Sequence, residues 1–509
     1  MSLARTFLLA TSWPRHRAFV RDCRDPYRAQ FRVWRETWAE IGDSPFWRDK
    51  MGSRAGGPRP SLGSFPLTTY DDYAHALDRS FDQTWSELSG ADVAFWSVSA
   101  GSTGPRKLFP ITEAYRRQFQ RTTPPLLHGL ARRHRKMLSK PVLYFAGSMP
   151  QERSPAGVEV GFISNYNYRN VPAFLRKLYA FPVEVLRDGD TFYEWGPLYA
   201  LATDLSAMVG ITPAIMVRFF ERMIAQIDRY WPILEGWQDP PAPLPPVRVS
   251  PQRLRLLRAV LKSPAPCLAD LWPSLAFVCC WKASTCGMQL PSLERHLGTR
   301  VPIVDATYSA TEGWINVPRP DGAPGGAIHP GAHVFEFLPV GAAAKPHNLL
   351  RAWELQPGSE YEIVLTTAMG LVRYRLHDIV ECTGRFERTP LIRFVQKSSN
   401  EISLGPACVS ETELCDALRG SGVSAERALF APAPGGNRIQ LLCWSDRTLP
   451  DVEAVERSLR SANPMYRKYV GDGSLAPLEL RLLTPDHPIL RRDEHAQMKP
   501  RLLLREPVV

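Results

Sequence analysis

The sequence lacks the patterns of disulfide-rich, zinc-binding and membrane-spanning proteins. Its nine cysteines include no Cys-x-x-Cys pair, and Cys279, Cys280 and Cys286 lie together without a zinc spacing, which indicates reduced and mostly buried thiols. The longest apolar runs, such as residues 275–281, fall far short of the about 20 residues that a membrane span needs. The opening, MSLARTFLLATSWPRHR, has too short an apolar centre for a secretory signal. We therefore expect a cytoplasmic protein without a membrane partner.

Basic residues outnumber acidic ones, so the net charge is +11 and the pI is about 9.3. This balance favours an anionic partner, either a nucleic acid or a phosphorylated small molecule. The densest basic stretch, ARRHRKMLSK at 131–140, has no aromatic residues interleaved for base stacking, and we interpret it as solvated surface. Because no nucleic-acid-binding motif is recognisable, we expect no nucleic acid partner.

Short apolar runs alternate with amphipathic helical patterns over most of the 509 residues. Residues 140–147 and 275–281 are predicted as buried strands, and residues 213–231 as an amphipathic helix. Helical spacing of Phe31, Trp34, Trp38 and Ile41 predicts an N-terminal helix packed on the core. This alternation predicts an α/β class, with parallel or mixed sheets flanked by helices.

The pattern changes near residue 385. The last stretch contains strand-like LIRFVQ, RALFAP, RIQLLCW and PLELRLL, together with helical SETELCDALRG and VEAVERSLRSA. We therefore predict a large domain at 1–385, a hinge at 386–400 and a small α+β domain at 401–509.

A loop rich in glycine and hydroxyl groups follows an apolar stretch in SVSAGSTGPRKLFPIT, residues 97–112. Backbone N–H groups of such a turn, with the hydroxyls of Ser99, Ser102 and Thr103, can bind phosphate oxygens, and Lys107 adds positive charge. The loop lacks the ending of the GxxxxGK[ST] motif. Thr112 can cap a following helix, so the loop is predicted to join a strand to a helix.

Two acidic residues stand out in distant apolar segments. Glu312 in DATYSATEGWINV suits a Mg²⁺ ion that bridges phosphates. Asp378 in GLVRYRLHDIVECTG lies between apolar residues, where it can accept hydrogen bonds from the two hydroxyls of a ribose. The alternative for Asp378 is an ion pair with Arg373 or Arg375.

The order of these motifs resembles the adenylate-forming superfamily, and within it the acyl acid amido synthetases that conjugate jasmonate, auxin or benzoates to amino acids. FPLTTYDDY, SAGSTGPRKLFP, SPAGVEVGFISNYNYRN, YSATEGWI, HVFEFLP, GLVRYRLHDIVECTG and QMKPR carry the resemblance over nearly the whole chain. It implies a large adenylate-forming domain with a smaller, mobile C-terminal domain. It also implies that ATP and Mg²⁺ convert a carboxylic acid to an acyl adenylate, from which the amine of an amino acid takes the acyl group.

Roles for individual residues follow from this resemblance. Lys107, Glu312 and Lys499 would be catalytic, with Glu312 positioning Mg²⁺ and Lys499 carried on the mobile domain. The ATP-binding residues would be Ser99, Gly101, Ser102, Thr103, Gly104, Tyr308, Thr311, Asp378 and Lys397, the last of these at the hinge. The acyl group would lie near Arg117, Arg121, Ile211 and Thr212, with the two arginines on one helix face. Ser164 and Asn165 would orient the amino acid acceptor.

The sequence also departs from the family pattern. His377 replaces a glycine of the family, and we interpret it as a packed residue. The phosphate loop is one residue shorter than in the plant enzymes, and GPACVSE at 405–411 stands where the family has an Asp-Lys pair. These departures leave open a thioester ligase that uses the same adenylate. A binding protein without turnover is the other alternative, against which Glu312, Asp378 and Lys499 argue.

Overall fold

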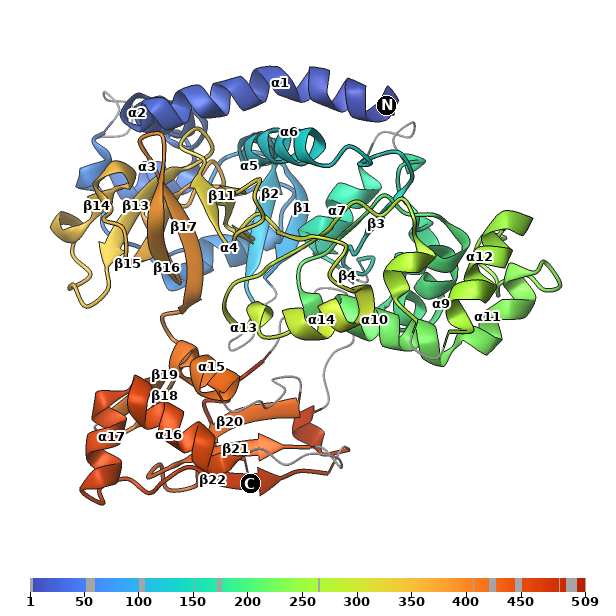
Figure 1. The fold of residues 1–509 in the computed structure, drawn as a ribbon. Coiled ribbons are helices and arrows are strands. Elements are labelled where there is room, and N and C mark those ends of the chain that lie inside the picture. Colours follow the sequence, from blue (N-terminus) through green and yellow to red (C-terminus); the bar gives the residue numbers. More distant parts are fainter. Residues whose placement is uncertain are drawn as a thin grey trace.

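A computed structural model describes residues 3–51, 60–99, 106–150, 152–171, 176–263, 266–405, 407–420, 427–444, 451–484, 486–490 and 501–508. Figure 1 shows a larger N-terminal part and, below it, a smaller C-terminal part. The N-terminal part holds three main sheets that share two large apolar cores. The C-terminal part has cores of its own, built from residues 402–508.

A seven-stranded antiparallel sheet forms one side of the N-terminal part, in the order β11-β12-β17-β16-β15-β13-β14. Its long hairpin, β16 and β17, pairs Asp378 with Lys397 in register. Residues on alternate positions of these strands fill the core between this sheet and helix α2 (Pro26–Ile41). The strands are β11 (Asn316–Pro318), β12 (Gly326–Ile328), β13 (Val334–Pro339), β14 (Leu350–Arg351), β15 (Glu360–Thr366), β16 (Tyr374–Phe386) and β17 (Thr389–Lys397).

The β17 strand changes the position of the predicted hinge. Residues 389–397, which contain LIRFVQ, pair with β16 and β12 and therefore belong to the N-terminal sheet. The chain leaves this sheet at Ser398 and enters the next strand, β18 (Glu401–Leu404), at Glu401. We therefore propose a linker at 398–400 in place of the predicted 386–400.

A parallel four-stranded sheet, in the order β3-β6-β7-β8, forms the other side. Predicted strands at 140–147 and 275–281 are found as β3 (Val142–Tyr144) and β7 (Val278–Cys280), beside β6 (Ala207–Val209) and β8 (Ile303–Asp305). The predicted helix at 213–231 is two helices, α10 (Pro213–Ala225) and α11 (Ile227–Leu234), because Gln226 leaves the helical conformation. Other helices here are α9 (Gly189–Ala202), α12 (Pro251–Leu261), α13 (Ser284–Gly287) and α14 (Leu290–Leu297).

A four-stranded mixed sheet lies between these two, in the order β2-β1-β5-β4. Strands β1 (Val93–Val98) and β2 (Leu108–Thr112) are antiparallel, with Val98 opposite Leu108. The glycine-rich loop therefore joins two strands of a hairpin, and the prediction that it joins a strand to a helix is wrong. Helix α5 (Glu113–Phe119) begins only after β2, where the Thr112 hydroxyl accepts from Tyr115 N. The sheet also contains β4 (Glu152–Arg153) and β5 (Glu159–Gly161).

Helices cover this central region from outside. Helix α1 (Leu3–Arg24) crosses the top of the molecule and packs on α6 (Thr123–Arg133) (Figure 1). Helix α2 (Pro26–Ile41) buries Trp34 and Ile41 in the core, as its spacing predicts, but leaves Phe31 53% exposed. Shorter helices α3 (Pro45–Met51), α4 (Ala74–Phe81) and α7 (Ile163–Arg169) complete the layer.

The C-terminal part follows the predicted α+β pattern. It contains the hairpin β18 (Glu401–Leu404) and β19 (Ala407–Ser410), and the mixed sheet β20 (Ala428–Pro432), β21 (Ile439–Cys443) and β22 (Glu479–Leu482). Helices α15 (Glu411–Gly420), α16 (Val452–Ala462) and α17 (Pro464–Gly471) accompany these strands.

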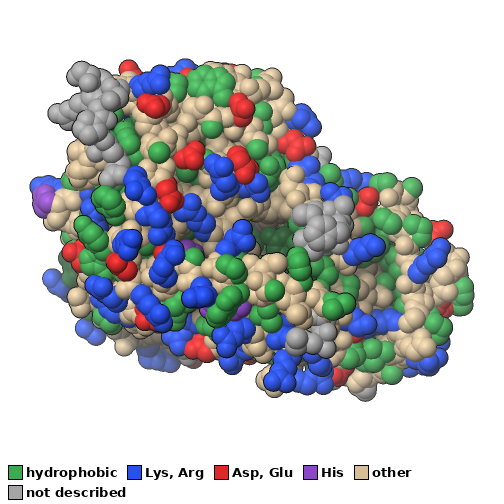
Figure 2. All heavy atoms as spheres, turned by 90° about the horizontal axis from the view of Figure 1, so that it is seen from above, with side chains coloured by type: hydrophobic (Ala, Val, Ile, Leu, Met, Phe, Trp, Pro, Cys, Tyr) green, Lys and Arg blue, Asp and Glu red, His purple; other side chains and the backbone are tan. Residues whose placement is uncertain are grey.

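The basic stretch at 131–140 is solvated as predicted, because its arginine and lysine side chains are exposed. Figure 2 shows lysine and arginine side chains interspersed with acidic ones over the face that is seen from above. Many arginines of the described chain pair with nearby carboxylates, as Arg116 does with Glu113. Within the described residues, no helix combines the length and hydropathy of a membrane span.

Candidate active site

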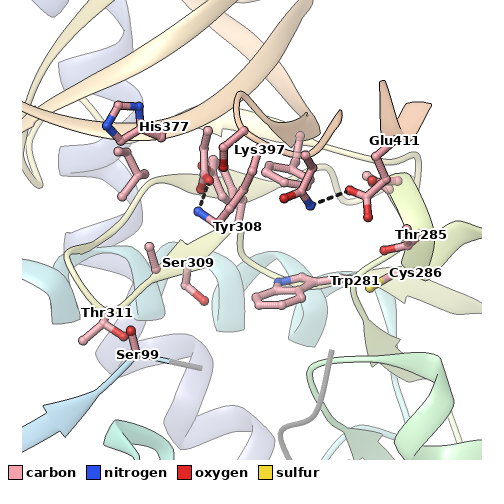
Figure 3. A pocket seen from close by; sticks show the side chains of 18 of the residues that line it. Ser99, Trp281, Thr285, Cys286, Tyr308, Ser309, Thr311, His377, Lys397 and Glu411 are labelled. Carbon is pink, nitrogen blue, oxygen red and sulfur yellow. Dashed lines mark hydrogen bonds and ion pairs between the residues drawn. The ribbon is translucent and has the colours of Figure 1, made fainter. Parts of the chain in front are cut away.

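A cavity of about 420 Å³ lies between the two parts of the chain. Its walls come from the β1–β2 hairpin, the ends of β7 and β8, the β16–β17 hairpin and the C-terminal part. Figure 3 shows Ser99 and Thr311 at one end and Thr285 and Cys286 at the other, with Trp281 between them. The lining includes the predicted residues Ser99, Lys107, Tyr308, Thr311, Glu312, Asp378 and Lys397.

Asp378 is held by two donors in this cavity. Its side chain is buried, and its two oxygens accept from the Tyr308 hydroxyl at 2.6 Å and from Lys397 Nζ at 2.5 Å. Burial alone lowers the pKa of Lys397, but Asp378 and Glu312 more than offset it, so this pKa lies above its usual value. The partner of Asp378 is therefore Lys397, and the alternative pairing with Arg373 or Arg375 is wrong: Arg373 pairs with Glu336 and Arg375 with Glu362.

Glu312 lines the same cavity, close enough to Lys397 for the two charges to interact. Its side chain is buried, and Tyr374 donates a long hydrogen bond of 3.4 Å to Oε1. Burial raises the pKa of Glu312, while Lys397 opposes the shift. A buried carboxylate that keeps free lone pairs can still bind a cation.

The described ends of the glycine-rich loop reach this cavity. Ser99 N donates to the Lys107 carbonyl at 3.0 Å, which closes the base of the loop, and the Lys107 ammonium lies 5.2 Å from the centre of the Tyr70 ring. Both residues line the cavity. Gly101, Ser102, Thr103, Gly104 and Lys499 fall outside the described residues.

Sequence reasoning missed one wall of the cavity. Trp281 and the segment Ser284–Cys286 line it directly after strand β7, and Asp305 lines it at the end of β8. Burial raises the pKa of Asp305 to about 6, although three backbone N–H groups oppose the shift. Ligands of α/β sheets bind at the carboxyl ends of parallel strands. The small residues that follow the predicted strand at 275–281 could therefore have indicated this wall of the cavity.

The predicted acyl residues lie elsewhere. Arg117 belongs to α5 and pairs with Glu40 at 3.4 Å, while Arg121 lies in the following 3₁₀ turn and donates to Glu36 and to the Gly331 carbonyl. The two arginines are thus not on one helix, because the α-helix ends at Phe119. Both line a second cavity of about 920 Å³, together with aromatic residues that include Phe119, Tyr168 and Trp314.

Ile211 and Thr212 form the turn before α10. Thr212 is buried at the N-cap position, and the Ile211 carbonyl accepts from Trp281 N at 2.9 Å. Ile211 therefore lies beside Trp281, which lines the main cavity, while the described lining includes neither Ile211 nor Thr212.

Ser164 and Asn165 hold a neighbouring turn. The Ser164 hydroxyl accepts from Gly147 N at 3.0 Å, and the Asn165 amide donates to the Gly147 carbonyl at 2.8 Å. Asn165 Oδ1 also accepts from Arg169 at 2.8 Å, and both side chains are buried. These contacts support a role in positioning Gly147; the described lining of the main cavity includes neither residue.

His377 lines the main cavity, one residue before Asp378. Its φ of 57° lies in the left-handed region, where glycine is favoured and a side chain is strained. This conformation explains why a glycine suits the position. The His377 side chain is about a third exposed and lines the cavity, and its interpretation as a packed residue stays a prediction.

Comparison with known proteins agrees with this geometry. The GH3 family N-terminal domain matches residues 17–235 and the GH3 family central domain matches residues 326–397, together more than half of the chain. An indole-3-acetic acid-amido synthetase GH3.8 of Oryza sativa subsp. indica is 26% identical over 504 residues, covering 87% of this chain and 83% of that protein. A probable synthetase of the same kind, GH3.1 of Arabidopsis thaliana, is also 26% identical, over 82% of this chain and 78% of that protein.

Solved structures share the fold. The AtGH3.15 acyl acid amido synthetase in complex with 2,4-DB superimposes with a TM-score of 0.80 at 17% identity, over 96% of this chain and 93% of that one. A 2-hydroxyisobutyryl-CoA ligase in its postadenylation state has a TM-score of 0.56 at 12% identity, over 94% and 88%. The chain belongs to the GH3 family, the acyl acid amido synthetases of the adenylate-forming superfamily.

Proposed function

We propose that this protein is an ATP-dependent acid-amido synthetase, which adenylates a carboxylic acid and transfers the acyl group to the amine of an amino acid. The observation that carries the proposal is that Ser99, Lys107, Glu312 and Asp378, from three separate segments, line one cavity. Family membership gives the reaction class, since the GH3 relatives are named amido synthetases. These names favour an amine over a thiol as acceptor.

The residues of the cavity suit a bound nucleotide. Asp378, oriented by Tyr308 and Lys397, has lone pairs left for the ribose hydroxyls. Trp281 and Tyr308 offer ring faces to the base, and Lys107 lies beside the phosphate loop. Because both the acid and ATP are anions, the ammonium groups of Lys107 and Lys397 would lower the repulsion between the reactants.

Glu312 fits a Mg²⁺ site shared with substrate. Magnesium is commonly held by one or two carboxylates together with phosphates and water, and Glu312 offers one such carboxylate. Among the described residues, no three metal-ligating side chains form a cluster, so the ion would depend on the phosphates for its remaining ligands. When bound, it would neutralise charge that develops on the phosphates.

We place the acyl group in the second cavity. Its aromatic lining would bury an apolar acid, and Arg117 and Arg121 lie beside it. The C-terminal part would rotate about the linker at 398–400, bring Lys499 to the reacting phosphate in one step, and exclude water in the next.

The purified protein, given ATP, Mg²⁺ and pools of carboxylic acids, tests the proposal. We expect AMP and pyrophosphate to form, with an amide product only when an amino acid is added. Coenzyme A in place of the amino acid is the matched control. A thioester product with coenzyme A, and no amide, would contradict amide synthesis. The absence of AMP with every acid would contradict adenylation.

A further inference from the structure

His377 keeps an imidazole where the backbone favours glycine. The residue lies in strand β16, immediately before Asp378, with a φ of 57°. A Cβ in this region collides with the neighbouring carbonyl, so the position is strained for any residue except glycine. Residues in this conformation persist where the surrounding structure holds them, and they cluster at active sites and ligand-binding sites.

The Nδ1 atom of the imidazole ring has polar neighbours within the protein. Nδ1 lies 3.5 Å from Glu362 Oε1 and 3.5 Å from the Ser398 hydroxyl, and the His377 carbonyl accepts from Ser398 N at 2.8 Å. Glu362 is itself fixed by two hydrogen bonds from Arg375. Within the described residues, Nε2 has no hydrogen-bond partner. The ring is thus oriented through Nδ1, while Nε2 remains available to a ligand in the cleft.

The groups that face His377 are mainly cationic. Arg375 from its own strand, Lys107 from the β1–β2 hairpin and Lys397 from β17 disfavour its protonated form, and only Glu362 from β15 favours it. Burial adds to the three cations, so the pKa of His377 lies below its usual value in the empty cleft. An anion bound between Lys107 and the ring would cancel this repulsion.

We propose that His377 is a phosphate-binding residue, which takes up a proton when the polyphosphate of a nucleotide enters beside Lys107 and then donates a hydrogen bond from Nε2. The inference rests on the proposed function for its physiological ligand. The ligand class is a pyrophosphate or triphosphate anion. The proton comes from solvent and returns to it when the anion leaves. Pyrophosphate is therefore held more tightly at acid pH and released more readily as the pH rises.

The direction of the pH dependence follows from this uptake of one proton. At pH values between the His377 pKa of the free protein and that of the complex, the dissociation constant for pyrophosphate rises by up to about tenfold per pH unit. The phosphates titrate in the same range, but they do so equally in every variant. The difference between the wild type and a His377 variant therefore reports on the imidazole alone.

Calorimetric binding of inorganic pyrophosphate and of a non-hydrolysable ATP analogue tests the proposal, in two buffers of different ionisation enthalpy. His377→Gln keeps a polar side chain without the charge, and His377→Gly also relieves the backbone strain, so at least one variant is expected to fold. His347→Gln, on an exposed 3₁₀ turn, is the matched control. Histidine ring NMR of the wild type gives the His377 pKa with and without pyrophosphate.

Near neutral pH, we expect the wild type and the His347→Gln control to bind as much as one proton per pyrophosphate. The two His377 variants should bind fewer protons. Near pH 6, both His377 variants should bind about tenfold more weakly than the wild type, with the difference vanishing near pH 8. Equal proton uptake in wild type and His377→Gln, or a His377 pKa that pyrophosphate does not raise, would overturn the inference. If the wild type binds neither ligand and forms no AMP, the proposed function itself fails.

Discussion

Replacing Asp378 by asparagine removes one charge from the candidate nucleotide site while it preserves the shape of the side chain. The carboxylate accepts from Tyr308 and Lys397 and would also accept from two ribose hydroxyls. Hydrogen bonds to a charged group are worth about 1–1.5 kcal/mol more than those to a neutral one. For two hydroxyls the loss is about 2–3 kcal/mol, which corresponds to a rise of about 30- to 150-fold in KM for ATP.

The same change destabilises the fold only modestly. Removing one partner of a fully buried ion pair costs about 3–5 kcal/mol, but Lys397 remains 32% exposed and can be hydrated in the variant. We therefore expect the free energy of unfolding to fall by about 1–2 kcal/mol. ATP–pyrophosphate exchange measures KM, and urea denaturation measures stability. Glu381→Gln, on the same strand and paired with Arg393 outside the cavity, is the control. An Asp378→Asn variant with the KM of the wild type would refute the ribose role.

Three further predictions follow from the described contacts. Glu312→Gln should raise the Mg²⁺ concentration needed for half-maximal exchange by about tenfold, since a charged ligand is lost; an unchanged midpoint would argue against the metal role. Burial lowers the pKa of His329 to about 4 and of His333 to about 3. As the pH falls, the two imidazoles are therefore protonated in the unfolded chain before they are protonated in the folded one. The free energy of unfolding should then fall below about pH 6.5, by up to about 1.4 kcal/mol per pH unit for each ring. Urea denaturation near pH 7 and pH 5 measures this loss, and equal stability at both would contradict it. Asn165→Ala should lower the free energy of unfolding by about 1–3 kcal/mol, because the Gly147 carbonyl loses its donor. The KM for ATP should stay unchanged. A changed KM for ATP with unchanged stability would contradict the positioning role.

The sequence was informative where local pattern and structure coincide. Short apolar runs became β3, β7, β20 and β21, and Thr112 capped α5 as its spacing predicts. Family motifs led to Glu312 and Asp378, although only tertiary pairing with Tyr308 and Lys397 shows how Asp378 is held. These partners lie far along the chain, so no local signal encodes them.

Errors arose where long-range pairing overrides local pattern. The stretch at 389–397 resembles the small domain in composition, yet strand pairing with β16 binds it to the larger sheet. The hairpin of β1 and β2 was missed because LFPIT contains a proline and is short, so the helix after it appeared to follow the loop directly. Arg117 and Arg121 have helical spacing, but the α-helix tightens into a 3₁₀ turn between them.

The hairpin that carries the glycine-rich loop has a consequence for salt dependence. In nucleotide loops that precede a helix, the aligned peptide dipoles at the helix N-terminus supply about half a positive charge, and this contribution stays fixed in the fold. Here the loop returns into strand β2 with no helix directly after it, so side-chain cations such as Lys107 supply a larger share of the attraction for an anion. Dissolved ions shield such groups readily, and nucleotide affinity should therefore weaken markedly as ionic strength increases.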